Sequence, residues 1–217
     1  GMRLSATKIK AIRASMTEEE SLTDYLFPLL RYHARWSELT ADDFRYFASV
    51  DKKTHSGYYM RVEVNPVTSN PDYLPLADYS FGANAMSYLD KIRTLCDEKG
   101  ITLILMKAPS ISPVWYDEWE AQIDAYAEKY QLTYCNTLEL IDEIGIDYNT
   151  DTYDKGLHMN VSGAEKVSAY LGKLLQDTCA LPDHRGEEPY ASVWAEKLEY
   201  YNAERARMEA AAGTKGA

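Results

Sequence analysis

The chain has 217 residues, of which 46% are hydrophobic and 26% are charged, and its formal net charge is −11. This size suits one α/β domain with some decoration, and the acidic balance disfavours binding to nucleic acid, whose phosphates demand clustered Lys and Arg. No basic-then-apolar leader is present, and the longest apolar run, residues 101–106, is too short to span a bilayer, so the localisation stays open.

Residues 1–80 are predicted to form a helical and irregular N-terminal region. A capping box that begins at Thr17 precedes leucines at helical spacing, and a further short helix is expected from Thr40. Residues 51–80 are rich in proline and read as irregular structure. One alternating stretch within them, residues 58–64, is typical of an edge strand or a hairpin arm.

Residues 81–180 are predicted to form an α/β core. Capped apolar stripes predict helices near 84–99, 117–130 and 163–178, and short apolar runs predict parallel strands at 101–106 and 132–135. The first run is continuous, as in a strand that is buried on both faces, so it is expected to be central. Because sheets usually have about four strands or more, two strands leave the core incomplete. Residues 58–64, another copy of the chain or a missing upstream segment would complete it.

Residues 181–217 are predicted to contain a charged linker, a last helix and a disordered tail. Tyr190, Trp194 and Leu198 recur at helical spacing and predict a helix that packs on the core, while the tail is expected to begin at Ala210. Three cysteines, with no CxxC pair among them, are expected to be reduced thiols: Cys96, Cys135 and Cys179.

The loop between the second strand and the helix near 163–178 holds the residues with the clearest chemical potential. Loops at the carboxyl ends of parallel strands build binding crevices, and His158 lies in this one, just before a helix. A carboxylate upstream of such a histidine can fix its tautomer, so that the imidazole acts as a general base. Asn160 and Ser162 are predicted to hold the turn through local hydrogen bonds. His33, His55 and His184 are expected to be solvated residues without partners.

The order Asp154, Gly-Leu-His158-Met-Asn160 and then Gly-Ala-Glu-Lys resembles the last sequence block of the SGNH/GDSL hydrolase superfamily. It is especially similar to bacterial cell-surface members related to D-alanyl transfer and alginate O-acetylation proteins. The strand end from Ile104 to Ser110 also resembles those members, and the likeness covers residues 83–178. It implies a flavodoxin-like parallel sheet flanked by helices, with a Ser-His-Asp site that acts on a small ester or an acylated glycan. The resemblance implies neither a cofactor nor a metal.

The sequence departs from the family pattern at two places. The aspartate usually stands three residues before the histidine, where this chain has Lys155, so Asp154 takes the role and Asp151 is the reserve. The Gly-Asp-Ser turn that carries the nucleophile is absent. Ser110, at the carboxyl end of a strand, is the reserve nucleophile, although its Pro-Ser-x-Ser-Pro setting is first of all a turn signal.

The sequence therefore predicts an SGNH-like ester hydrolase or O-acyltransferase fold that is the C-terminal part of a longer protein and inactive alone. The alternative is a non-catalytic remnant that binds a protein or a glycan.

Overall fold

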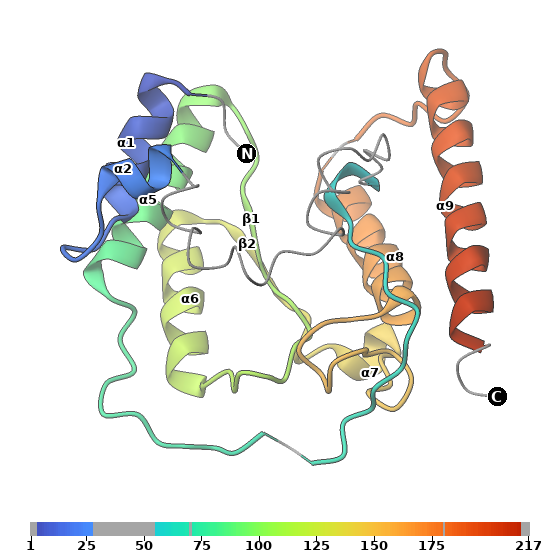
Figure 1. Cartoon of the computed structure of the whole chain (residues 1–217), viewed down its shortest axis with the longest axis horizontal. Helices are drawn as coiled ribbons and strands as arrows, with labels where there is room; N and C mark the ends of the chain where they lie inside the picture. The colour runs from blue at the N-terminus through green and yellow to red at the C-terminus, as the bar shows by residue number, and fades with distance from the viewer. Residues whose placement is uncertain (1–3, 28–54, 70, 180, 214–217) are drawn as a thin grey trace. The chain divides into compact units, whose positions relative to one another are not determined.

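The computed structural model describes residues 4–27, 55–69, 71–179 and 181–213 (Figure 1), and it divides into two compact units. Unit 1 is Gly1–Lys53 and unit 2 is Thr54–Ala217. The described residues confirm the mixed α/β class, with helices around a small parallel sheet. The helix expected from Thr40 and the residue His33 lie outside the described ranges.

Two short helices make up the described part of unit 1. Helix α1 (Ala6–Ser15) is capped by Ser5, whose hydroxyl accepts from the backbone N–H of Lys8 at 3.1 Å. Helix α2 (Leu22–Leu26) is capped by Ser21, so the predicted capping box begins no helix. Thr17 N–H does donate to the Glu20 carboxylate at 3.1 Å, but Ser21 lies directly before the apolar residues and sets the helix start there.

The sheet of unit 2 consists of two parallel strands, β1 (Ile104–Lys107) and β2 (Thr133–Asn136). They pair in the register Ile104↔Thr133 through Lys107↔Asn136. The predicted parallel pairing is confirmed, with each strand displaced toward the C-terminus of its predicted range. The connection between the strands is helix α6 (Asp117–Tyr130), the crossover that a parallel pair requires.

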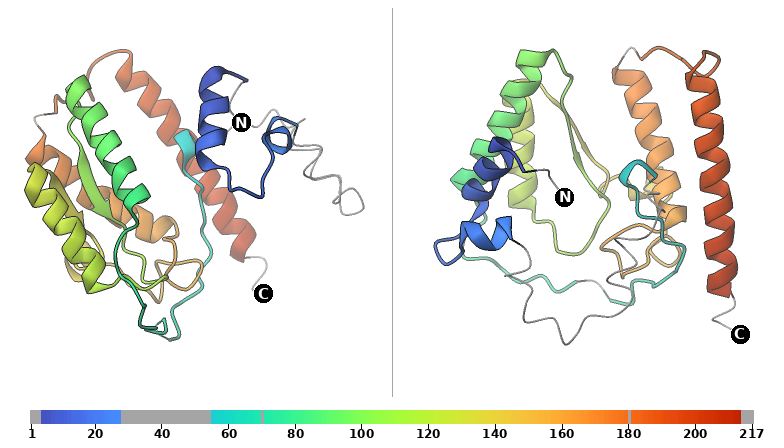
Figure 2. Two further views of the ribbon diagram at one scale, coloured as in Figure 1. Left: turned by 90° about the vertical axis from the view of Figure 1, so that its left-hand side faces the viewer. Right: turned by 45° about the horizontal axis from the view of Figure 1, so that its top comes forward.

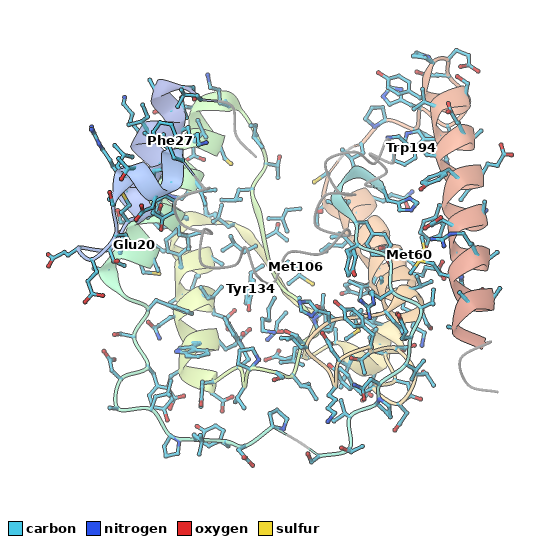
Figure 3. The ribbon with its side chains drawn as sticks, viewed as in Figure 1. Glu20, Phe27, Met60, Met106, Tyr134 and Trp194 are labelled. Atoms are coloured by element: carbon cyan, nitrogen blue, oxygen red, sulfur yellow. The ribbon has the colours of Figure 1, made fainter. Side chains whose placement is uncertain are left out.

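Helices cover the two faces of this sheet unequally. On one face, the Tyr134 hydroxyl of β2 donates to Glu120 of α6 at 2.8 Å, and α5 (Ala83–Lys99) joins α6 through a 2.9 Å bond from Tyr126 to Asp90. On the other face, burial raises the pKa of the Cys135 thiol, whose sulfur contacts Tyr170 of α8 (Val161–Thr178). Figure 3 shows Met106 and Tyr134 pointing to opposite sides of the strand pair.

The position of β1 contradicts the prediction of a central strand. In the described part of the chain its only neighbour is β2, none of its residues is buried, and Met106 is 43% exposed. Ile101, which was predicted to begin the strand, precedes it and is 57% exposed. The apolar side chains of residues 101–106 suit a strand that is buried on both faces. In the described part of the chain, however, no second neighbouring strand covers β1.

The C-terminal helices lie side by side (Figure 1, Figure 2). Helix α9 (Tyr190–Gly213) contacts α8 through Glu165, which accepts from Tyr201 at 3.0 Å and from Arg205 at 2.6 Å. The predicted last helix is therefore present. The prediction of a disordered tail from Ala210 was wrong for the first residues, since α9 continues to Gly213.

Candidate functional site

Asp154 and His158 form a doubly hydrogen-bonded pair. One carboxylate oxygen of Asp154 accepts from the backbone N–H of His158 at 2.7 Å, and the other lies 2.6 Å from its ring Nδ1. An ionised carboxylate can only accept, so this contact places a proton on Nδ1, and in the neutral imidazole Nε2 then keeps its lone pair. This is the tautomer that a general base needs.

The backbone of the loop explains how an aspartate four residues upstream reaches the histidine. Lys155, which occupies the family's usual aspartate position, has φ 61°, and Gly156 has φ 88°. These two left-handed residues turn the chain back toward Asp154. A Cβ on Gly156 would lie 2.5 Å from the Ile111 side chain, so both the turn and the packing require glycine there.

Thr152 is the fully buried centre of the loop. Its hydroxyl donates to the His158 carbonyl at 2.9 Å and accepts from the Gly156 N–H at 2.8 Å. A single antiparallel bridge joins Thr152 to Met159 and closes the loop. The Asp154–His158 pair therefore lies within a loop that is closed by these contacts.

Asp151, the reserve partner of His158, bonds to other groups. Its side chain is fully buried, and its carboxylate contacts Lys166 Nζ at 2.6 Å and Ser162 Oγ at 2.7 Å. It also accepts from the Asp147 N–H at 2.8 Å. Burial by itself raises the pKa of Asp151, but the Asp147 amide, Lys166 and Ser162 together hold it below its ordinary value. Asp151 therefore ties the start of the loop to α8.

Asn160 and Ser162 lie where the loop enters α8. Asn160 is the N-cap and accepts from Gly163 N–H at 3.2 Å, while its amide nitrogen donates to the carbonyls of Thr150 and Glu63 at 2.7 and 3.1 Å. The helix begins before Ser162, which is free to bond Asp151 instead of capping. Both side chains thus hold the loop through bonds to residues within it and beyond it.

An extended segment, residues 58–67, runs along the loop and supports it. Two backbone bonds join Asn65 to the loop: its N–H donates to Thr152 at 2.9 Å and its carbonyl accepts from Lys155 at 3.1 Å. The Arg61 carbonyl accepts from Val161 N–H at 2.7 Å. Residues 58–64 were predicted as an edge strand or hairpin arm, but they form no strand and pair with the site loop. The alternating pattern was the only sequence signal of this role.

An aromatic stack flanks the imidazole. The Tyr153 and His158 rings are nearly parallel, with centroids 5.7 Å apart and an interplanar angle of 6°. The Arg61 guanidinium lies 4.9 Å from the centre of the Tyr153 ring and also donates to the Tyr59 hydroxyl at 3.1 Å. The pair is therefore oriented by a stack as well as by hydrogen bonds.

A pocket of about 390 Å³ brings His158 and Ser110 together. Its walls include Tyr58, Tyr59 and Tyr153, so aromatic side chains line the pocket together with the imidazole. The His158 side chain is 59% exposed, which leaves the ring accessible to a ligand. A cavity of this size fits a small ligand, which the three tyrosines would contact mainly through apolar surface.

Ser110 shares this pocket, yet its hydroxyl bonds to a lysine. Lys107, at the end of β1, donates to the Ser110 carbonyl at 3.0 Å and lies 3.3 Å from its Oγ. Burial lowers the pKa of Lys107. Within the described ranges no hydrogen bond joins Ser110 Oγ to His158, so the nucleophile–base contact of a triad is not formed by these two residues.

The other histidines that the structure describes have partners, contrary to expectation. His184 Nδ1 lies 2.7 Å from the Glu187 carboxylate, and His55 stacks on Tyr200 with ring centroids 4.8 Å apart. The partner of His184 is three residues away in the sequence. The partner of His55 lies about 145 residues away in the sequence, so no local pattern could reveal that contact.

In the described ranges, no group of His, Cys, Asp and Glu side chains is placed to hold a metal ion, and the three cysteines are free thiols. No helix in the same ranges is long and apolar enough to cross a membrane. In comparisons with known proteins, no family model, no curated protein and no solved structure matches the chain.

Proposed function

We propose that this chain carries the general-base half of an ester hydrolase or O-acyltransferase of the SGNH/GDSL type. The observation that carries the proposal is the pair of short contacts from one Asp154 carboxylate to the backbone N–H and the ring Nδ1 of His158. They leave Nε2 free to accept a proton inside a pocket. The loop between β2 and α8 presents this group. In open α/β sheets, loops that follow the carboxyl ends of strands build the binding crevice.

In this proposal His158 Nε2 takes the proton of a hydroxyl nucleophile as the hydroxyl oxygen attacks an acyl carbonyl carbon. Asp154 stabilises the imidazolium that forms, and His158 then returns the proton to the leaving alkoxide. The substrate would be a small ester or an acylated glycan, and the chemistry requires no cofactor. The parallel β1–β2 pair, contacted by α6 on one face and α8 on the other, is compatible with the flavodoxin-like sheet that the family resemblance implies.

We further propose that the chain needs a nucleophile from a segment beyond these 217 residues, and that it is inactive alone. Ser110 is the reserve nucleophile, because it lines the same pocket as His158. Its Oγ accepts from Lys107 and, among the described residues, makes no hydrogen bond to His158, however, and the chain has no Gly-Asp-Ser turn. Removing a single oxyanion donor typically costs about a hundredfold or more in rate, so losing the whole nucleophile turn should abolish turnover.

The test is hydrolysis of p-nitrophenyl acetate by the purified chain and by its His158→Ala variant. We expect equal rates at the level of background, and a matched His55→Ala variant should behave likewise because that histidine does not line the pocket. If the reading frame extends upstream, adding that part should give activity that falls at least about a hundredfold in His158→Ala. Turnover of the original chain that is lost in both His158→Ala and Ser110→Ala would instead identify a triad within these residues.

A non-catalytic binding module is the second candidate. The exposure of His158 and the absence of a hydrogen bond between it and Ser110 favour this alternative. The extended reading frame discriminates between the two. Failure of the extended protein to hydrolyse or transfer acyl groups in a His158-dependent manner would favour the binding module.

A further inference from the structure

A second cavity, of about 450 Å³, lies at the C-terminal end of α8, the opposite end from the sequence block that carries His158. Its walls come from the second half of α8, the linker at residues 181–185 and the first turns of α9. It shares no lining residue with the His158 pocket. This groove is therefore a separate candidate site.

Two aromatic residues of α9 form one wall of the groove. Trp194 is 64% exposed and Tyr190 is 48% exposed, and their spacing of four places them on the same side of the helix. The His184 ring lies 4.8 Å from that of Tyr190 and extends the aromatic surface. Figure 3 shows Trp194 on α9 beside the linker. Large aromatic side chains left in solvent at a concave surface are typical of a binding site.

The polar groups of the groove carry charges that are already compensated. Arg185 makes a two-point contact with the Asp183 carboxylate, at 2.8 Å from Nε and 2.6 Å from Nη2. His184 Nδ1 lies 2.7 Å from the carboxylate of Glu187, a residue that does not line the groove. The carboxylate and the guanidinium among the lining side chains are those of Asp183 and Arg185, so their charges cancel, and a wholly apolar ligand would desolvate them without replacing their hydrogen bonds.

The walls of the groove are joined by contacts further along the two helices. Glu165 of α8 accepts hydrogen bonds from both Tyr201 and Arg205 of α9. These contacts hold α9 against α8, so the groove is formed without a ligand. A preformed site loses less conformational freedom on binding.

We propose that this groove binds a neutral carbohydrate. The apolar C–H faces of the sugar rings would stack on Tyr190 and Trp194, one sugar for each exposed ring. Planar side chains at the rim, Asp183, Arg185 and Gln176, would exchange hydrogen bonds with the hydroxyls. A neutral polyhydroxylated ligand matches both features of the groove, its exposed aromatic rings and its balanced polar groups. The proposal does not depend on the proposed function of His158.

The test is isothermal titration calorimetry of the whole chain with cellohexaose, maltohexaose, chitohexaose, mannohexaose and xylohexaose. At least one should bind, and Trp194→Ala should weaken that binding roughly tenfold or more, as for an exposed aromatic anchor. Tyr190→Ala is the second variant and should act in the same direction. Leu198→Ala is the matched control, because Leu198 is also exposed and apolar on α9 but does not line the groove.

The same titrations can overturn the proposal. Failure of all five oligosaccharides to bind would do so, as would equal affinities in wild type, Trp194→Ala and Tyr190→Ala. Loss of binding in Leu198→Ala as well as in the groove variants would point to a general change in α9 and count against the site. A Trp194-dependent response to an unstructured peptide such as reduced casein, with none to the sugars, would assign the groove to polypeptides instead.

Discussion

Two aspartates three residues apart in the same loop have different roles because their surroundings differ. Asp151 is completely buried and compensated by Lys166, whereas Asp154 is partly exposed and faces His158. The sequence pointed to both as candidate partners of the histidine. It could not separate them, because the distinction depends on Lys166, whose side chain reaches Asp151 only once α8 has formed.

We predict that Asp151→Ala lowers the free energy of unfolding by roughly 2–4 kcal/mol, since the Asp147 amide, the Ser162 hydroxyl and Lys166 all lose the buried carboxylate that they contact. The matched control is Asp177→Ala, which removes an Asp–Lys contact of the same length on the exposed surface of α8. That change should stay within about 0.5 kcal/mol. Urea unfolding of both variants measures the difference, and equal effects would refute a structural role for Asp151.

The lowered pKa of Asp151 predicts an acid-dependent contribution to stability. Its pKa in the folded chain lies below the unfolded value of about 3.9, so the carboxylate stabilises the fold above that pH. The contribution is lost as the pH falls through the folded-state pKa. Below about pH 4 the urea midpoint should therefore fall more steeply for wild type than for Asp151→Ala. Parallel pH profiles for the two proteins would contradict this assignment.

At the scale of elements, the first turn of α8 is built around Gly163. A Cβ at Gly163 would lie 2.5 Å from the Asp151 carbonyl oxygen and 2.8 Å from Met159 Sδ, so the loop packs directly on the helix backbone. Gly172, two and a half turns further on, has open space around the same position. Packing therefore requires a glycine at position 163 of α8 and does not require one at position 172.

We predict that Gly163→Ala destabilises the chain by roughly 1–3 kcal/mol, because the backbone carbonyl of Asp151 cannot move without disturbing the loop. Gly172→Ala should instead stabilise it by up to about 1 kcal/mol through helix propensity. Thermal and urea unfolding of the two variants measure whether each change lowers or raises the free energy of unfolding. A neutral or stabilising Gly163→Ala would show that the loop does not pack on α8 as described.

The long helices of unit 2 were predictable, the short helix α7 (Ile141–Ile144) was not, and the support of the site was predictable only in part. Local spacing identified α5, α6 and α8, because an apolar stripe and a cap are encoded within a few residues. The loop residue His158 and its partner Asp154 followed from a short motif. The backbone hydrogen bonds of residues 58–67 to the loop did not, since they join segments about ninety residues apart and carry no side-chain signature. Whether the site is catalytic stays a prediction.

Within unit 2, the structure leaves much apolar surface uncovered around the sheet. Met106 on β1 is 43% exposed, and α5 has no buried residue, with Ile92 and Leu95 each at least half exposed. Parallel strands are normally covered on both faces and rarely occur in pairs alone. Such a surface favours association, either with a further segment that completes the sheet or with a second copy of the chain.

The isolated chain should therefore bind 8-anilinonaphthalene-1-sulfonate and associate with rising concentration, as measured by dye fluorescence and sedimentation velocity. Ile92→Lys should reduce both signals without lowering the urea midpoint, because Ile92 is half exposed and contributes little to the core of the chain. Thr94→Lys adds the same charge at an exposed polar position of α5 and should leave both signals unchanged. If the two variants behave alike, the association depends on net charge and not on the apolar surface of α5. If wild type stays monomeric and does not increase the fluorescence of the dye, these side chains are covered in solution by contacts within the chain itself.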